Sequence, residues 1–257
     1  SSMCGFFPIN AAIIQWFEHK RARALSMVGL GLALGGLATP VVAGAMHSFG
    51  WRPTAMASGV LIIVIGWPLA RVMRRRPEDY GDYVDGKAPS VALAGEAGAT
   101  VPLPPEDLSV GQALRTSAFW LISIGHGLAL LVVTAVNVHA INHMRETLGY
   151  SLPQASWYIM LMTACQIVGV LIGGAIGDRF DKRRISATCM LAHAIGLSLL
   201  AYATGPAMLI GFAVFHGVAW GVRGPLMQAI RADYFGRRAI GKILGVAALI
   251  VAIGQVC

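Results

Sequence analysis

Residues 177–184 read GDRFDKRR, a run with six charged residues between two long apolar stretches. Residues 155–177 lead into the run and residues 185–204 follow it, and neither stretch contains Asp, Glu, Lys or Arg. A helix needs roughly 20 mostly apolar residues to cross the hydrocarbon core of a bilayer. The pattern therefore predicts two membrane-spanning helices joined by a short charged loop.

The whole chain has the composition of a membrane protein. Its 257 residues are 56% hydrophobic and 12% charged, and the mean hydropathy is +0.66. A soluble domain carries about 25% charged residues, so these values exclude a soluble enzyme, a disordered chain and a disulfide scaffold. The net charge of +8 does not indicate nucleic acid as a partner, because the basic residues lie in short runs between apolar stretches.

Apolar stretches of span length recur along the chain, which predicts an all-α polytopic membrane protein. Two shorter apolar pieces, at 1–14 and 239–257, are interpreted as helices cut by the ends of a fragment; the alternative is a complete short protein with half-spans. Six full spans are predicted, at 24–46, 54–72, 118–142, 155–177, 185–204 and 206–230.

The basic residues predict which side of the membrane each loop occupies. Seventeen of the 20 Lys and Arg residues fall in alternate loops, two fall in the other loops, and Arg223 lies inside a span. Loops rich in Lys and Arg face the cytoplasm. A Pro-rich polar segment at 74–117 belongs to this side and is predicted to be a linker between helical regions 1–73 and 118–257.

A short internal repeat supports two helical halves. WFEHKRARALSMVG at 16–29 and YFGRRAIGKILG at 234–245 each carry an aromatic pair, basic residues and a glycine that opens an apolar stretch. Both copies precede a helix that leaves the same side of the membrane. A parallel repeat of two transporter halves has this pattern.

GDRFDKRR resembles the signature cytoplasmic loop of the major facilitator superfamily, with Asp181 where glycine is usual. Five further stretches resemble the branch of oxalate/formate antiporters and monocarboxylate transporters. The resemblance implies a partial major facilitator fold that runs from the late fourth helix into the eleventh. The five stretches are WFEHKRARALSMVGLGLALGG (16–36), FGWRPTAMASG (49–59), RRRPEDYG (74–81), ALRTSAFWLI (113–122) and ADYFGRR (232–238).

Arg223 is the principal candidate for substrate binding. A charge inside a span is costly and normally faces a cavity, and a guanidinium binds a carboxylate through two parallel hydrogen bonds. Gly224 and Pro225 are expected to open the helix beside it. The alternative is that Arg223 extends to the membrane surface, or pairs with a loop acid as part of a gate.

Four uncharged polar residues are placed on cavity-lining helices by the resemblance, whereas His193 falls on a peripheral helix and is discounted. His216 lies two turns from Arg223 on one face, so both are expected to reach one aqueous path. Histidine titrates near neutral pH and is able to carry protons; a hydrogen bond between helices is the alternative for each. The four candidates are His126, Asn137, Gln166 and His216.

Asp178, Arg179 and Arg183 are candidates for a conformational latch, because charges at the ends of two helices form salt bridges in one state and lose them in another. The alternative is that they only fix topology.

No metal site is predicted: the cysteines lack ligand spacing, and His139 and His143 are interpreted as surface residues. No cofactor is implied, and the motifs of common enzyme classes are missing from the sequence.

Together these features predict a secondary transporter that moves a small organic anion, such as a monocarboxylate, by alternating access in a bacterial inner membrane. Protons or a second anion are the candidate coupling ions. Two alternatives remain open, namely an exporter of hydrophobic compounds and a membrane sensor on the same fold, because a fold does not determine a function.

Overall fold

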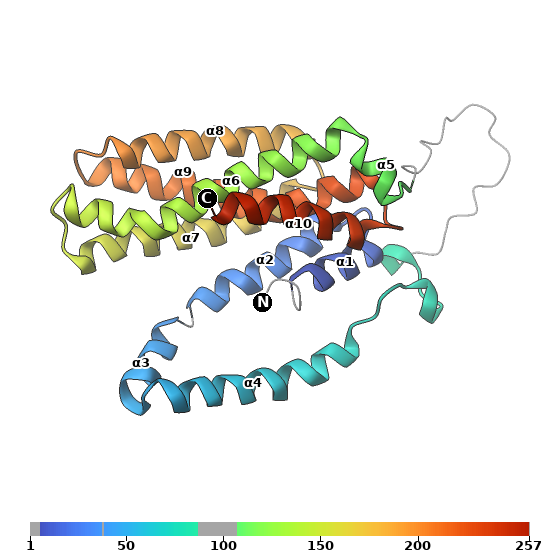
Figure 1. Cartoon of the computed structure of the whole chain (residues 1–257), viewed down its shortest axis with the longest axis horizontal. Coiled ribbons are helices and arrows are strands. Elements are labelled where there is room, and N and C mark those ends of the chain that lie inside the picture. The colour runs from blue at the N-terminus through green and yellow to red at the C-terminus, as the bar shows by residue number, and fades with distance from the viewer. Residues whose placement is uncertain (1–5, 38, 87–106, 257) are drawn as a thin grey trace.

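The computed structural model describes residues 6–37, 39–86 and 107–256, and within these ranges the chain is helical without β-strands (Figure 1). This confirms the all-α prediction. The helices are α1 (Phe6–Trp16), α2 (Arg21–Leu37), α3 (Thr39–Phe49), α4 (Trp51–Val72), α5 (Val110–Leu114), α6 (Ser117–Glu146), α7 (Leu152–Ile176), α8 (Lys182–Ala201), α9 (Pro206–Phe235) and α10 (Ile240–Val256), with short 3₁₀ turns at Glu78–Tyr80 and Val84–Gly86.

Within the described ranges, five helices are long and apolar enough to cross a membrane, namely α4 and α6 to α9. They coincide with five of the six predicted spans. The sixth, at 24–46, is described as α2 up to Leu37 and as α3 from Thr39; residue 38 lies outside the described ranges, so a continuous span here stays a prediction.

Local sequence explains where several helices begin. Ser109 and Gln112 form a reciprocal capping box at the start of α5, and Ser151 and Gln154 form another at α7. Asp181 accepts a hydrogen bond from the backbone of Arg183 and so caps α8. These side chains satisfy backbone N–H groups that the first helical turn leaves without partners.

Helix α9 forms the centre of a bundle with α6, α7, α8 and α10. Half of its most apolar window is buried, compared with none of the corresponding window of α4. Helices α7 and α9 approach closely because glycines face backbone on both sides, which is the small-residue packing common between membrane helices. A Cβ atom would collide with the backbone of the opposite helix at Gly169, Gly217 and Gly221, and would be tightly placed against it at Gly173.

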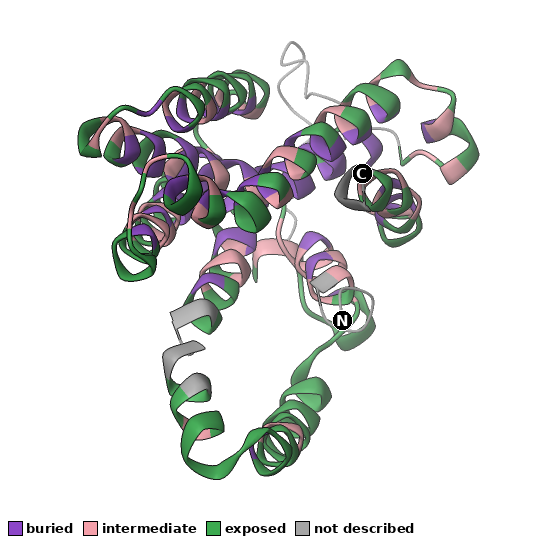
Figure 2. Cartoon of the chain, turned by 60° about the vertical axis from the view of Figure 1, so that its left-hand side comes forward, coloured by how far each residue is buried: buried purple, intermediate pink, exposed green. Residues whose placement is uncertain are grey.

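The N-terminal helices join this bundle at one end. Helix α2 packs on α7 and α9, while α4 lies apart from the bundle and is exposed along its length (Figure 2). An exposed apolar run such as 60–65 belongs in lipid or against other helices, since soluble proteins do not leave such patches in water. We call the end where α4 and α9 finish and α2, α6, α8 and α10 begin the linker end.

Candidate functional site

Arg223 lies at mid-depth in α9, twelve residues or about 18 Å before the helix ends. Its side chain is buried, with only 1% of the residue exposed. Nη1 lies 2.9 Å from Nδ1 of His126 on α6, whereas Nε and Nη2 have no hydrogen-bond partner. No carboxylate pairs with Arg223 among the described residues. Two of its donor nitrogens are therefore available to an anion.

His216 points to a different neighbour from Arg223, although the two residues lie two turns apart on α9. Its Nδ1 lies 3.2 Å from Nδ1 of His193 on α8, and the two rings meet edge to face. His216 and Arg223 thus contact different neighbours, and a path shared by both stays a prediction. His193 had been discounted as peripheral. The proximity of His193 to His216 could have been predicted from the short connection between α8 and α9. Such a connection places residues at similar distances from the turn at the same depth.

Asn137 and Gln166 are not joined to either pair. Asn137 is exposed on α6, three turns beyond His126. Gln166 is half-buried on α7, and its backbone carbonyl lies against Gly221 of α9. Neither side chain is hydrogen-bonded to Arg223, so their role in a substrate path stays a prediction.

Arg231 is a second buried cation on α9, one residue beyond the span predicted at 206–230. Only 2% of the residue is exposed, and Nη1 lies 3.4 Å from both the Met227 carbonyl and Gln228 Oε1. Its Nε and Nη2 lack partners. It was missed because α9 continues five residues beyond the predicted end of the span. Arg231 lies between Arg223 and the linker end.

The expected opening of the helix at Gly224 and Pro225 is also wrong. Helix α9 runs without interruption from Pro206 to Phe235. Proline removes one backbone hydrogen bond, but residues 225–232 are buried on all sides and this packing keeps the helix continuous.

Asp178 connects the charged loop to the N-terminal helices. Its Oδ1 accepts a hydrogen bond from the backbone N–H of Ala22 at 2.8 Å, and Oδ2 accepts one from Arg23 at 3.0 Å. These N–H groups lie in the first turn of α2, where a carboxylate is favoured by unpaired donors and by the helix dipole. Asp178 therefore caps a helix that is distant in sequence.

A second connection at this end uses Asp233 on α9, which the sequence analysis missed. Its two carboxylate oxygens bind Arg21 of α2 at 2.7 Å and Lys182 of α8 at 2.9 Å. Arg21 is buried, with a side chain that is 5% exposed, so this contact is shielded from water. The acid and both cations are visible in the sequence, but their pairing depends on the approach of α2 to α9.

The other two predicted latch residues make local contacts or none. Arg183 binds Asp181 in its own loop and donates a 3.4 Å hydrogen bond to the Tyr234 hydroxyl. Hydrogen bonds from Arg183 hold the pKa of the exposed Asp181 below its ordinary value. Arg179 is exposed and has no ion pair in the part of the chain that the structure describes. The latch roles of these residues stay predictions.

The two copies of the sequence repeat adopt comparable turns at the linker end. Asp85 accepts hydrogen bonds from the backbone N–H groups of Glu18 and His19, just before α2. Asp107 accepts them from Arg237 and Arg238, just before α10. Each acid comes from the segment that connects α4 to α6, so this segment contacts both copies.

Comparison with known proteins identifies the family. The sequence matches the model of the Major Facilitator Superfamily over residues 2–141 and again over residues 122–257. The chain belongs to the Major Facilitator Superfamily. It is an integral membrane protein, and its helices represent part of the major facilitator fold.

Individual members of the superfamily resemble the chain over most of its length. It is 23% identical to the MFS transporter asaE of Aspergillus flavus, over 97% of this chain and 52% of that protein. It is 23% identical to the hexuronate transporter of Escherichia coli, over 90% of this chain and 56% of that protein. It is 27% identical to the membrane sensor protein UhpC of Escherichia coli, over 86% and 52% respectively. The chain spans about half the length of these curated relatives.

Proposed function

We propose that this chain is part of a secondary transporter for a small organic anion, which works by alternating access across a bacterial inner membrane. The observation that carries the proposal is Arg223, a buried cation at mid-depth with two unpaired donor nitrogens and no acidic partner among the described residues. A carboxylate would satisfy both nitrogens through parallel hydrogen bonds. His126 orients the guanidinium from the opposite helix.

The proposed substrate carries a carboxylate, and two classes of carboxylate are candidates, namely monocarboxylates and sugar acids. The monocarboxylate branch is favoured by the sequence stretches described above. A sugar acid is favoured by the similarity to a hexuronate transporter, because a hexuronate is also a carboxylate. Both classes place a carboxylate on Arg223, and Arg231 provides a second cation on the path toward the linker end.

Alternating access requires contacts that hold one end of the molecule closed in one state and separate in the other. We assign this role to the bonds from Asp178 to α2 and from Asp233 to Arg21, because both join the N-terminal helices to the C-terminal bundle. The linker end faces the cytoplasm in this proposal, in agreement with its Lys and Arg residues.

Protons are a candidate coupling ion, and the His193–His216 pair is the candidate carrier. A hydrogen bond between two Nδ1 atoms needs one ring to donate and the other to accept, so the bond is lost when both rings are protonated. Proton uptake would therefore change the contact between α8 and α9.

The test is uptake by the protein reconstituted in liposomes, with labelled lactate, formate, oxalate and galacturonate, with and without a pH gradient. Arg223→Gln should raise the half-saturating substrate concentration roughly tenfold to a hundredfold, as expected for one lost charge-assisted contact. Arg223→Lys should retain part of the uptake. Arg115→Gln is the matched control, since Arg115 is exposed and outside these contacts. Uptake of an acid that Arg223→Gln leaves unchanged would contradict the role of Arg223.

A membrane sensor is the second candidate, supported by the similarity to UhpC. The two functions differ in one measurement. A sensor would bind a carboxylate in detergent, in an Arg223-dependent manner, without exchanging labelled for unlabelled ligand across a liposome membrane. Counter-flow of the label would exclude the sensor.

A further inference from the structure

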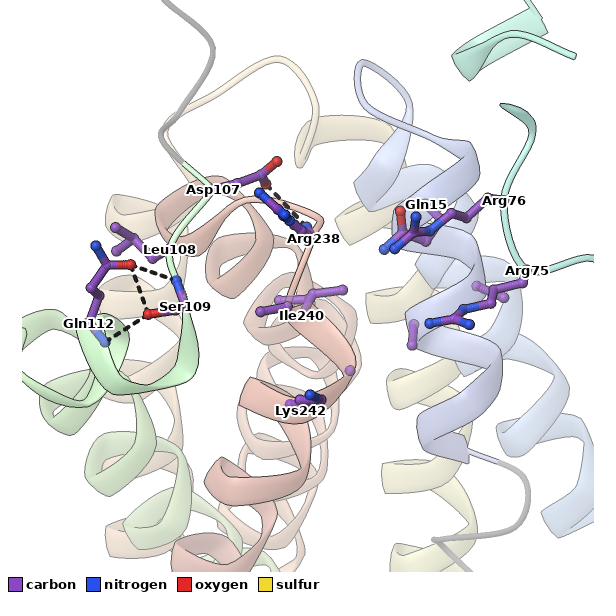
Figure 3. Close-up of a pocket in the computed structure, with 14 residues that line it drawn as sticks. Gln15, Arg75, Arg76, Asp107, Leu108, Ser109, Gln112, Arg238, Ile240 and Lys242 are labelled. Atoms are coloured by element: carbon purple, nitrogen blue, oxygen red, sulfur yellow. Dashed lines mark hydrogen bonds between the residues drawn. The ribbon is translucent and has the colours of Figure 1, made fainter. Parts of the chain in front are cut away.

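A cavity of about 790 Å³ lies at the linker end, remote from Arg223 and not used by the proposed transport path. Its walls come from α1, from the segment that follows α4, from the segment around α5 and from the start of α10 (Figure 3). It therefore joins the N-terminal helices, the connecting segment and the C-terminal bundle.

The cavity is strongly basic. Two of its four cations, Arg75 and Arg76, follow α4, and the other two, Arg238 and Lys242, lie at the start of α10. Figure 3 shows Arg75 and Arg76 extending across α1 toward the side that holds Lys242. Within the described ranges, none of the four side chains forms an ion pair or a hydrogen bond.

One carboxylate, that of Asp107, also lines the cavity, so four cations and one acid give a lining charge of +3. Oδ1 of Asp107 accepts hydrogen bonds from the backbone N–H groups of Arg237 at 2.8 Å and Arg238 at 3.1 Å. This carboxylate is thus directed at the turn before α10. Among the described lining residues, the cations therefore keep an excess of three positive charges.

A neighbouring cavity of about 280 Å³ shows a different balance. It shares Gln15, Arg76, Asp107 and Arg238 with the first cavity but also holds Glu78 and Asp79, and there Glu78 pairs with Arg237 at 3.5 Å. Ion pairs therefore form at this end where acids are present. The larger cavity has an excess of cations because its lining lacks such acids.

The position and the floor of the cavity indicate the type of anion. Arg75 and Arg76 follow the end of a membrane-spanning helix at Val72, and α10 begins at Ile240, so the cations lie at the level of lipid headgroups. The apolar part of the lining, or floor, includes Ala11 and Ala12 of α1 and Ile240 of α10. Guanidinium and ammonium groups around an apolar floor suit a phosphate ester.

We propose that this cavity binds a phosphate-type anion, supplied by an anionic phospholipid headgroup or by free phosphate. The bound anion connects α1, the segment after α4 and α10 through its oxygens. It stabilises the closed arrangement of the linker end, because the cations that surround it come from both sides of that contact.

The test measures binding to the protein purified in detergent, with three ligands: dispersed phosphatidylglycerol, dispersed phosphatidylcholine and inorganic phosphate at constant ionic strength. Retained lipid is counted by native mass spectrometry, and phosphate binding is followed by the shift in thermal unfolding. The double variant Arg76→Gln/Lys242→Gln should weaken binding by about tenfold for each lost cation. The variant Arg76→Lys keeps the charge and should keep most of the binding.

Arg184→Gln is the matched control, because Arg184 lies at the same end outside the cavity and its side chain is 90% exposed. Preference for phosphatidylglycerol over phosphatidylcholine, lost in the double variant only, identifies a lipid headgroup. Protection by inorganic phosphate with the same variant dependence identifies free phosphate. The proposal is overturned if no anion binds the wild-type protein, or if Arg184→Gln weakens binding as much as the double variant does.

Discussion

At the scale of single residues, glycines decide how closely the two central helices approach. A Cβ on Gly221 would collide with the carbonyl of Gln166 and lie 2.7 Å from the backbone nitrogen of Val170. Gly224 is three residues further on the same helix and has open space around its Cα. The contrast permits a direct test of packing within α9.

We expect Gly221→Ala to lower the free energy of unfolding by about 1–3 kcal/mol, because the backbone of α7 cannot move aside as a flexible side chain would. Gly224→Ala should leave stability unchanged or slightly raised, since alanine favours a helix. Thermal unfolding in detergent compares the two. Equal effects would show that the α7–α9 contact does not limit the size of residue 221.

The His193–His216 contact predicts energetic coupling between α8 and α9. In a double-mutant cycle of His193→Leu and His216→Leu, we expect a coupling energy of about 0.6 kcal/mol, the typical value for a hydrogen bond between membrane helices. Chemical unfolding of the four proteins in mixed micelles provides the measurement. Strict additivity would mean that the rings pack together without a hydrogen bond that matters for stability.

The sequence located the residues of the candidate site better than it located their partners. Arg223 was identifiable because a charge within an apolar span is conspicuous, and His126 was named as a path residue. Their contact depends on how α6 crosses α9, which no local pattern encodes. His193 and Arg231 were missed for separate reasons, one because its helix was assigned to the periphery and the other because a helix end was placed too early.

At the scale of elements, the spans were predictable because membrane helices need length and apolarity, and both are read directly from the chain. Residues 24–46 are described on both sides of residue 38 only, so their prediction as one span is not tested. The close contact of α7 with α9 was also open to prediction. The four-residue spacings of Gly169 with Gly173 and of Gly217 with Gly221 are the pattern of close helix packing.

Asp178 provides a test of a cap that acts between distant elements. Replacing it by alanine removes both acceptors from the first turn of α2, which costs about 1 kcal/mol for an N-cap. We expect the amides of Ala22 and Arg23 to exchange hydrogen about fivefold faster in Asp178→Ala, as measured by mass spectrometry.

Asp181→Ala is the appropriate control for that experiment, because Asp181 caps α8 within its own loop. This variant should speed exchange at the start of α8 and leave α2 unaffected. Faster exchange of α2 in both variants would indicate that the whole charged loop, rather than the Asp178 carboxylate, supports that helix.

At the scale of the whole molecule, the contacts between the N-terminal helices and the bundle gather at the linker end, while α4 lies apart from the bundle (Figure 1). The sequence repeat indicated two halves but not which end holds them together. The two halves are joined at this end by carboxylates of the C-terminal bundle. Asp178 accepts a hydrogen bond from the backbone of α2, and Asp233 forms an ion pair with Arg21 of α2. Such contacts are able to break without loss of either half.

The contact of α1 with α10 allows this closure to be fixed chemically. A Cβ on Gly241 would lie 3.9 Å from Cβ of Ala11, within the range that a disulfide spans. The pair Ala11→Cys with Gly241→Cys should therefore cross-link under mild oxidation and stop uptake, and a reductant should restore it. Ala11→Cys with Gly245→Cys is the matched control, since Gly245 lies one turn further along α10 with nothing within 4 Å of its Cβ position. A molecule that transports at an unchanged rate while α1 and α10 are joined would show that the linker end does not open during the cycle, and the roles assigned to Asp178 and Asp233 would fail with it.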